Sequence, residues 1–113
     1  MFIEHSIYVF PSQYPDQTVE VALEGEFDPT TSDELLKTFR RTEVSHAARL
    51  RIDLTHVSFL DSSTIHAIAV ACWTARTAGH AFSVRCGAGM TRRIFDILEM
   101  NEFLGVETAS VSA

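Results

Sequence analysis

Three segments of the chain alternate apolar with polar or small residues at the period of a β-strand. Side chains of a strand point to its two faces in turn, so each of these strands offers one apolar face. Strands of a doubly wound parallel sheet are apolar on both faces. The pattern therefore predicts a sheet with helices mainly on one side. The apolar positions are Val19, Val21 and Leu23, then Leu50, Ile52 and Leu54, then Phe82, Val84 and Cys86.

Three helical patterns separate and follow these strands. The first opens at Thr31-Ser32-Asp33-Glu34, which has the form of a capping box. The second runs from about Ser63 to Ala78, where Gly79 can supply the left-handed residue that ends a helix. The residues expected to face the core are Leu35, Leu36 and Phe39 in the first helix, Ile65, Ile68, Ala69, Cys72 and Trp73 in the second, and Met90, Ile94, Ile97 and Leu98 in the third.

The order of these elements predicts the fold class. A first edge strand is expected to include Ile3 and to reach Phe10, followed by a loop from Pro11 to Gln17. A last short strand is expected near 104–108. Strands that alternate with helices imply right-handed crossovers. We predict one α/β domain over residues 1–113, with a small mixed sheet of four to five strands and helices packed mainly on one face.

Charge and composition exclude several classes of partner. Nine basic residues against fifteen acidic ones give a net charge of −6, which disfavours nucleic acid. No apolar segment is long enough to cross a bilayer, and the acidic start Met1–His5 does not have the form of a secretory signal. Two cysteines do not make a disulfide framework, so we expect a cytoplasmic protein with no membrane partner. Cys72 and Cys86 are expected to pack as small hydrophobes, and a redox-sensitive pair stays open.

A polar run, Asp61-Ser62-Ser63-Thr64, stands where the third strand gives way to the second helix. Backbone N–H groups at a helix start carry partial positive charge, so a phosphate added there would meet a favourable field. We interpret Ser62 as a regulated phosphoacceptor, with Ser63 and Thr64 as alternative acceptors. A plain helix cap formed by Asp61 or Ser63 explains the same residues and is compatible with that role.

Two motifs in this order resemble the STAS domain, the fold of bacterial anti-sigma-factor antagonists. They are Gly25-Glu26-Phe27-Asp28, and Ile52-Asp53-Leu54 leading into Val57–Ser63. The stretch Arg92–Leu98 is also similar to the third helix of the family, and the resemblance covers roughly residues 17–107. The chain departs from the family at Thr64-Ile65-His66, where glycine, an aliphatic residue and glycine are usual. It departs again at Glu99, where a glycine often ends the third helix.

The resemblance implies an antagonist that binds an anti-sigma factor, itself a serine kinase, and is released when Ser62 is phosphorylated. A serine phosphatase would restore the active form. Asp28 is implied to lie beside the acceptor. STAS domains also serve as non-phosphorylated scaffolds in lipid-transport or sensory complexes, and this alternative stays open. The expected partner-binding residues are Asp28, Asp61, Ser63, Thr64 and His66.

Catalysis is not expected of this chain. A hydrolase would use Ser62 as nucleophile and His66, one turn further on, as base. The glycine-flanked serine turn of such enzymes is missing from the sequence. The five histidines share no metal-ligand spacing, so we expect neither a metal nor a cofactor. They are His5, His46, His56, His66 and His80.

Overall fold

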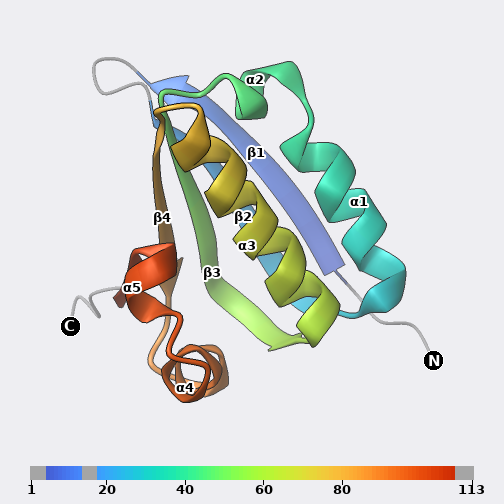
Figure 1. Cartoon of the computed structure of the whole chain (residues 1–113). Coiled ribbons are helices and arrows are strands. Elements are labelled where there is room, and N and C mark those ends of the chain that lie inside the picture. Colours follow the sequence, from blue (N-terminus) through green and yellow to red (C-terminus); the bar gives the residue numbers. More distant parts are fainter. Residues whose placement is uncertain (1–4, 14–17, 109–113) are drawn as a thin grey trace.

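A five-stranded mixed sheet is the centre of the fold in the computed structural model, which describes residues 5–13 and 18–108 (Figure 1). The strands lie side by side in chain order, β1-β2-β3-β4-β5. β1 is antiparallel to β2, and every other neighbouring pair is parallel. The predicted α/β class and mixed sheet are therefore confirmed. The bounds are β1 His5–Gln13, β2 Thr18–Phe27, β3 Arg49–Leu60, β4 Ala81–Cys86 and β5 Val106–Thr108.

The first strand is longer than the sequence predicts. β1 continues through Pro11 to Gln13, whereas the sequence predicts a loop from Pro11 onward. A proline is tolerated there because β1 is an edge strand, and its pairing with β2 shifts register between Phe10 and Gln13. The expectations for Ile3 and for residues 14–17 lie outside the described residues.

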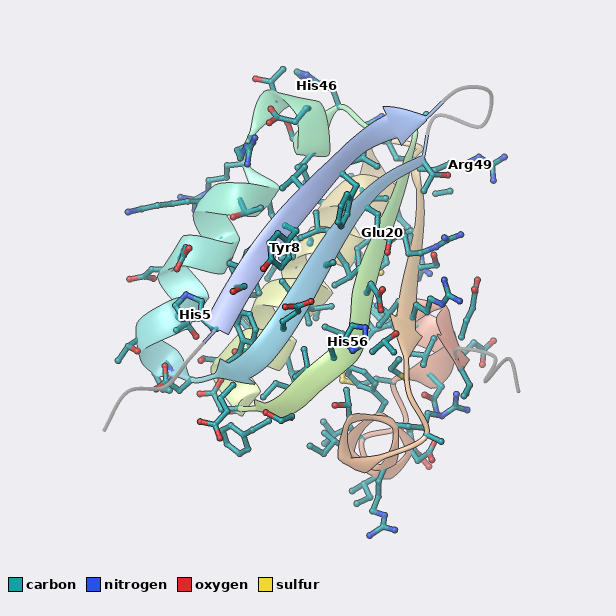
Figure 2. The ribbon with its side chains drawn as sticks, turned by 180° about the vertical axis from the view of Figure 1, so that it is seen from behind. His5, Tyr8, Glu20, His46, Arg49 and His56 are labelled. Carbon is teal, nitrogen blue, oxygen red and sulfur yellow. The ribbon has the colours of Figure 1, made fainter. Side chains whose placement is uncertain are left out.

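Helices cover one face of the sheet, as predicted. α1 (Pro29–Phe39) and α3 (Ser62–Thr77) lie next to each other across that face and start at the same end (Figure 1). The strand side chains beneath them, including Val21, Ile52 and Val84, are fully buried. Figure 2 shows the opposite face, where Tyr8, Glu20 and His56 stand clear of the described helices. Alternate burial along β2 and β3 thus reproduces the period-two pattern of the sequence.

The core between sheet and helices contains both thiols. Cys72 and Cys86 are free and fully buried, and burial raises the pKa of each thiol. The Cys72 Sγ donates to the carbonyl of Phe103 at 3.4 Å. These surroundings favour the interpretation of the cysteines as packed hydrophobes. Within the described ranges, no helix is long and apolar enough to span a membrane.

The inward face of the third predicted helix is wrong at two positions. In α4 (Met90–Ile97), Thr91 and Phe95 are buried, whereas Ile97 is 73% exposed and Leu98 is exposed as well. Because α4 has only eight residues, it contacts the core through a narrow i, i+4 stripe, formed by Thr91 and Phe95. The predicted stripe, which includes Ile97 and Leu98, lies on a different side of the helix. The side chain of Met90 lies outside the described residues.

The second predicted helix is confirmed in length but not in how much of it is buried. Trp73 is 68% exposed, so the expectation that it fills the core is wrong. At 3.6 residues per turn, Trp73 lies on the far side of α3 from its buried stripe, which includes Ile68, Ala71 and Cys72. Gly79 follows this helix with φ 82°, as predicted. Two short helices were not predicted, α2 (Thr42–Ser45) and α5 (Asn101–Leu104).

Glu99 ends α4 in a conformation that favours glycine. Its φ of 55° lies in the left-handed region, which costs a residue with a Cβ roughly 1–2 kcal/mol. The sequence position where the STAS resemblance expects a glycine therefore keeps the glycine-like backbone without the glycine.

Candidate functional site

The carboxyl ends of β2 and β3 meet at one end of the sheet, and a long helix starts from each. Phe27 pairs with Leu60 in the parallel register, and the Asp61 amide donates to the Phe27 carbonyl at 3.1 Å. α1 begins directly after Asp28, and α3 begins directly after Asp61. Two helix N-termini, each with outward N–H groups, are thus placed together (Figure 1).

Asp28 caps α1. Its Oδ1 accepts hydrogen bonds from the Thr30 amide (2.9 Å), the Thr30 hydroxyl (2.6 Å) and the Thr31 amide (3.2 Å). In return, the Asp28 amide donates to Thr31 Oγ1 at 3.0 Å, which completes a capping box. The capping box predicted at residues 31–34 is therefore wrong: the helix starts earlier, with Pro29 in its first turn. The Thr30 hydrogen bonds are the main cause of a lowered pKa for Asp28.

Asp61 caps α3 in a similar way. Its Oδ1 accepts from the Thr64 amide (3.0 Å), the Thr64 hydroxyl (2.9 Å) and the Ser63 hydroxyl (2.9 Å). Burial acts to raise the pKa of Asp61, but the hydrogen bonds from Thr64 and Ser63 outweigh it, and the pKa is lowered. Asp61 is therefore the residue that caps α3.

The three hydroxyls of the polar run differ in accessibility. Thr64 is fully buried, which argues against both roles considered for it, as an acceptor and as a partner-binding residue. Ser63 is half-buried, and its hydroxyl is held by Asp61. Ser62 is exposed in the first turn of α3, and within the described part of the chain its hydroxyl has no hydrogen-bond partner. Of the three, Ser62 alone is exposed and has a hydroxyl that no described residue engages.

The remaining predicted site residues are His66 and Asp28. His66 is exposed one turn further along α3, and no hydrogen bond between described residues joins it to Ser62. Asp28 lies at the neighbouring helix start, close enough that the charge of Asp61 opposes the lowering of the Asp28 pKa. Among the described residues, no three His, Cys, Asp or Glu side chains are placed to hold a metal ion.

Phe59 is a surface residue of this region that the sequence did not reveal. It is 50% exposed and lies two residues before Asp61, at the end of β3. Its apolar character predicts a core residue, but the buried Leu54 and Leu60 are both even-numbered, so alternation along β3 places Phe59 on the opposite face, where it pairs with Glu26 of β2. An exposed aromatic ring at an otherwise polar surface is typical of a protein-binding region.

Removing the Asp61 carboxylate should destabilise the protein measurably. We expect Asp61→Ala to lower the free energy of unfolding by about 2–3 kcal/mol, since it removes a helix cap and leaves the buried Thr64 hydroxyl without its acceptor. Asp61→Asn retains an acceptor and should lose less. Urea denaturation at pH 7 measures both, and equal stability of all three proteins would contradict this account of the cap.

The same cap predicts a pH dependence with a defined sign. The pKa of Asp61 is lower in the folded protein than its ordinary value of 3.8. The stabilisation from its charge is therefore fully present above the unfolded pKa and is lost as pH falls through the folded one. The stability difference between the wild type and Asp61→Asn should shrink below about pH 4. A difference that stayed constant down to pH 2 would show that the carboxylate charge plays no part.

Comparison with known proteins agrees with this architecture. The family model of the STAS domain matches residues 11–113. An anti-sigma factor antagonist from Mycobacterium paratuberculosis has a TM-score of 0.74 at 20% identity, over 91% of this chain and 85% of its own. SpoIIAA in its unphosphorylated form has a TM-score of 0.72 at 14% identity, over 93% and 89%. The Bacillus cell fate determinant SpoIIAA in the phosphorylated form has a TM-score of 0.70 at 14% identity, over 93% and 92%. No curated protein gives a significant match to the sequence.

Proposed function

Because the chain belongs to the STAS domain family, we propose that it is an anti-sigma-factor antagonist inactivated by phosphorylation of Ser62. The observation that carries this proposal is the exposed Ser62 hydroxyl at the start of α3, which has no hydrogen-bond partner among the described residues. Its partner would be an anti-sigma factor with serine kinase activity, and a serine phosphatase would reverse the modification. Such a protein acts in the bacterial cytoplasm. Two structures of similar fold are described as antagonists, and SpoIIAA exists in a phosphorylated form.

The proposed contact surface is centred on Ser62 and includes His66, Asp28 and the exposed ring of Phe59. Asp61 and Ser63 belong to its border, since their polar atoms are already engaged with each other. Thr64 is left out because it is buried. The surface joins an aromatic ring with small and charged groups, a mixture usual at the centre and rim of transient interfaces.

The proposed mechanism of release is local electrostatics. A phosphate on Ser62 adds about −1.5 to −2 charges next to the Asp61 and Asp28 carboxylates. The partial positive charge at the start of α3 would stabilise the free, phosphorylated protein by roughly 0.3–1 kcal/mol. In a complex, desolvation and repulsion of an unpartnered charge cost on the order of a few kcal/mol, which exceeds that gain. The modification would therefore release the partner without any change of fold.

Incubation with candidate anti-sigma kinases and ATP tests the proposal, followed by mass mapping of the modified residue. We expect one phosphate on Ser62 and loss of co-elution with the kinase. A stable complex with a membrane-transport ATPase, without phosphate transfer, would instead support the non-phosphorylated scaffold. Transfer to a residue outside the contact surface would overturn the assigned site.

A further inference from the structure

A groove opens between α1 and α3 toward their C-terminal ends, away from Ser62. Its cavity has a volume of about 300 Å³. Leu36 and Phe39 of α1 form one wall, Ala71 and Val70 of α3 form the other, and Val44 of α2 is part of the lining near the end of α1. Ala71 is nine residues beyond Ser62, or roughly 14 Å along the helix axis. The groove is therefore separate from the proposed contact surface.

The groove is open because α3 presents small side chains to α1. Ala67, Ala71 and Ala75 recur at one-turn intervals along its wall and are all buried, so this stripe of α3 fills little of the space next to α1. Val70 at the mouth is 41% exposed, and Leu36 and Phe39 are only half-buried. Apolar surface that a larger neighbour would cover is thus left accessible to a ligand.

The charged side chains of the described lining have one sign, which is positive. Among the described residues, Arg40 is the one arginine or lysine in the lining, accompanied by His80, Ser45 and Thr74, and none of these lining residues is a carboxylate. This composition is unusual in a chain with fifteen acidic and nine basic residues. Arg40 is exposed, and among the described residues its guanidinium has no hydrogen-bond or ion-pair partner. The adjacent Arg41, by contrast, is paired with Glu43.

We propose that this groove binds a medium-chain fatty acid, with the acyl chain between α1 and α3 and the carboxylate on Arg40. The apolar walls would bury the chain, and a guanidinium matches a carboxylate through paired hydrogen bonds. A cavity of about 300 Å³ suits a small molecule. The site goes beyond the proposed antagonist function, because it uses none of the residues around Ser62.

Isothermal titration with decanoate below its micelle concentration tests the site, with decanol as the uncharged analogue. We expect a single site for decanoate and about tenfold weaker binding of decanol, the loss typical of one charge-assisted hydrogen-bonded contact. Arg40→Gln should weaken decanoate about tenfold and leave decanol unchanged. Lys37→Gln is the matched control, since it removes the same charge from the exposed side of α1 without lining the groove. Equal weakening in both variants would show unspecific attraction and overturn the proposal.

Filling the groove provides a second, independent test. Ala71→Leu should abolish binding of both ligands, and Thr74→Leu at the exposed rim serves the same purpose should the first variant fail to fold. Ser62→Ala should bind decanoate as the wild type does, so failure of the antagonist function would leave this result unaffected. No heat with decanoate, or a self-associated protein dispersed by Ala71→Leu in sedimentation, would assign the groove to another role and overturn the proposal.

Discussion

Replacement of Ser62 by aspartate should weaken binding to the anti-sigma factor at least thirtyfold, whereas Ser62→Ala should bind as the wild type does and accept no phosphate. The exposed hydroxyl is neutral and small, so its removal leaves the surface unchanged. A carboxylate at the same place directly follows Asp61 in the chain and would be desolvated in the complex, at a cost of about 2 kcal/mol or more. Titration calorimetry with the purified kinase, and phosphate incorporation by mass spectrometry, measure the two effects.

Thr77→Asp is the matched control for that experiment. Thr77 is exposed on the same helix, about 22 Å along its axis from Ser62, and lies outside the proposed contact surface. The same charge added there should leave partner binding unchanged. If Ser62→Ala still took up one full phosphate, the acceptor would be Ser63 rather than Ser62, since Thr64 is buried. Equal weakening by both aspartates would mean that net charge, not position, controls the complex.

Truncation of Phe95 to alanine should lower the free energy of unfolding by about 3–5 kcal/mol, the cost of a large cavity in a packed core. Phe95 is fully buried and is the largest side chain that α4 contributes to the core. Ile97→Ala, two residues along the same helix, should change stability by no more than about 0.5 kcal/mol, because most of the Ile97 surface is in solvent. Urea denaturation of both variants measures the difference.

This pair decides which face of α4 packs against the sheet. Both substitutions replace a large apolar residue by alanine within the eight residues of α4, so helix propensity changes in the same direction. A large loss at Ile97 with little at Phe95 would restore the orientation that the sequence pattern predicts. The expected order of effects would confirm the orientation found here.

The sheet could be predicted because its strands obey a strict local rule. Val21, Ile52 and Val84 alternate with polar or small neighbours, and each is fully buried between the sheet and the helices. The Asp61–Thr64 run could also be recognised from local sequence, because Asp, Ser and Thr at a strand-to-helix junction are typical of a helix N-terminus. The sequence could not separate Ser62 from Thr64, because which hydroxyl turns inward depends on the rotation of α3 against the sheet.

The wrong predictions concern a helix start where two local patterns competed, and a side chain whose burial depends on tertiary packing. Asp28-Pro29 and the run after Thr31 are both good helix starts, and the proline in the first turn was the signal that favoured the earlier one. The size of Trp73 predicts a core residue, yet Trp73 lies on the far side of α3 from its buried stripe. The groove beside Ala71 had no counterpart in the sequence, since it depends on the separation of two helices that are distant along the chain.

The hydrogen bond from the Asp61 amide to the Phe27 carbonyl has a consequence for binding kinetics. It holds the starts of α1 and α3 together at the carboxyl ends of β2 and β3. The Asp28 and Asp61 carboxylates there are already fixed by the hydrogen bonds with which they cap the two helices. A partner that docks there meets a preorganised surface and has little backbone to order on arrival. Association should therefore follow a single exponential whose rate rises linearly with partner concentration, and the lifetime of the complex should depend on whether the phosphate is present.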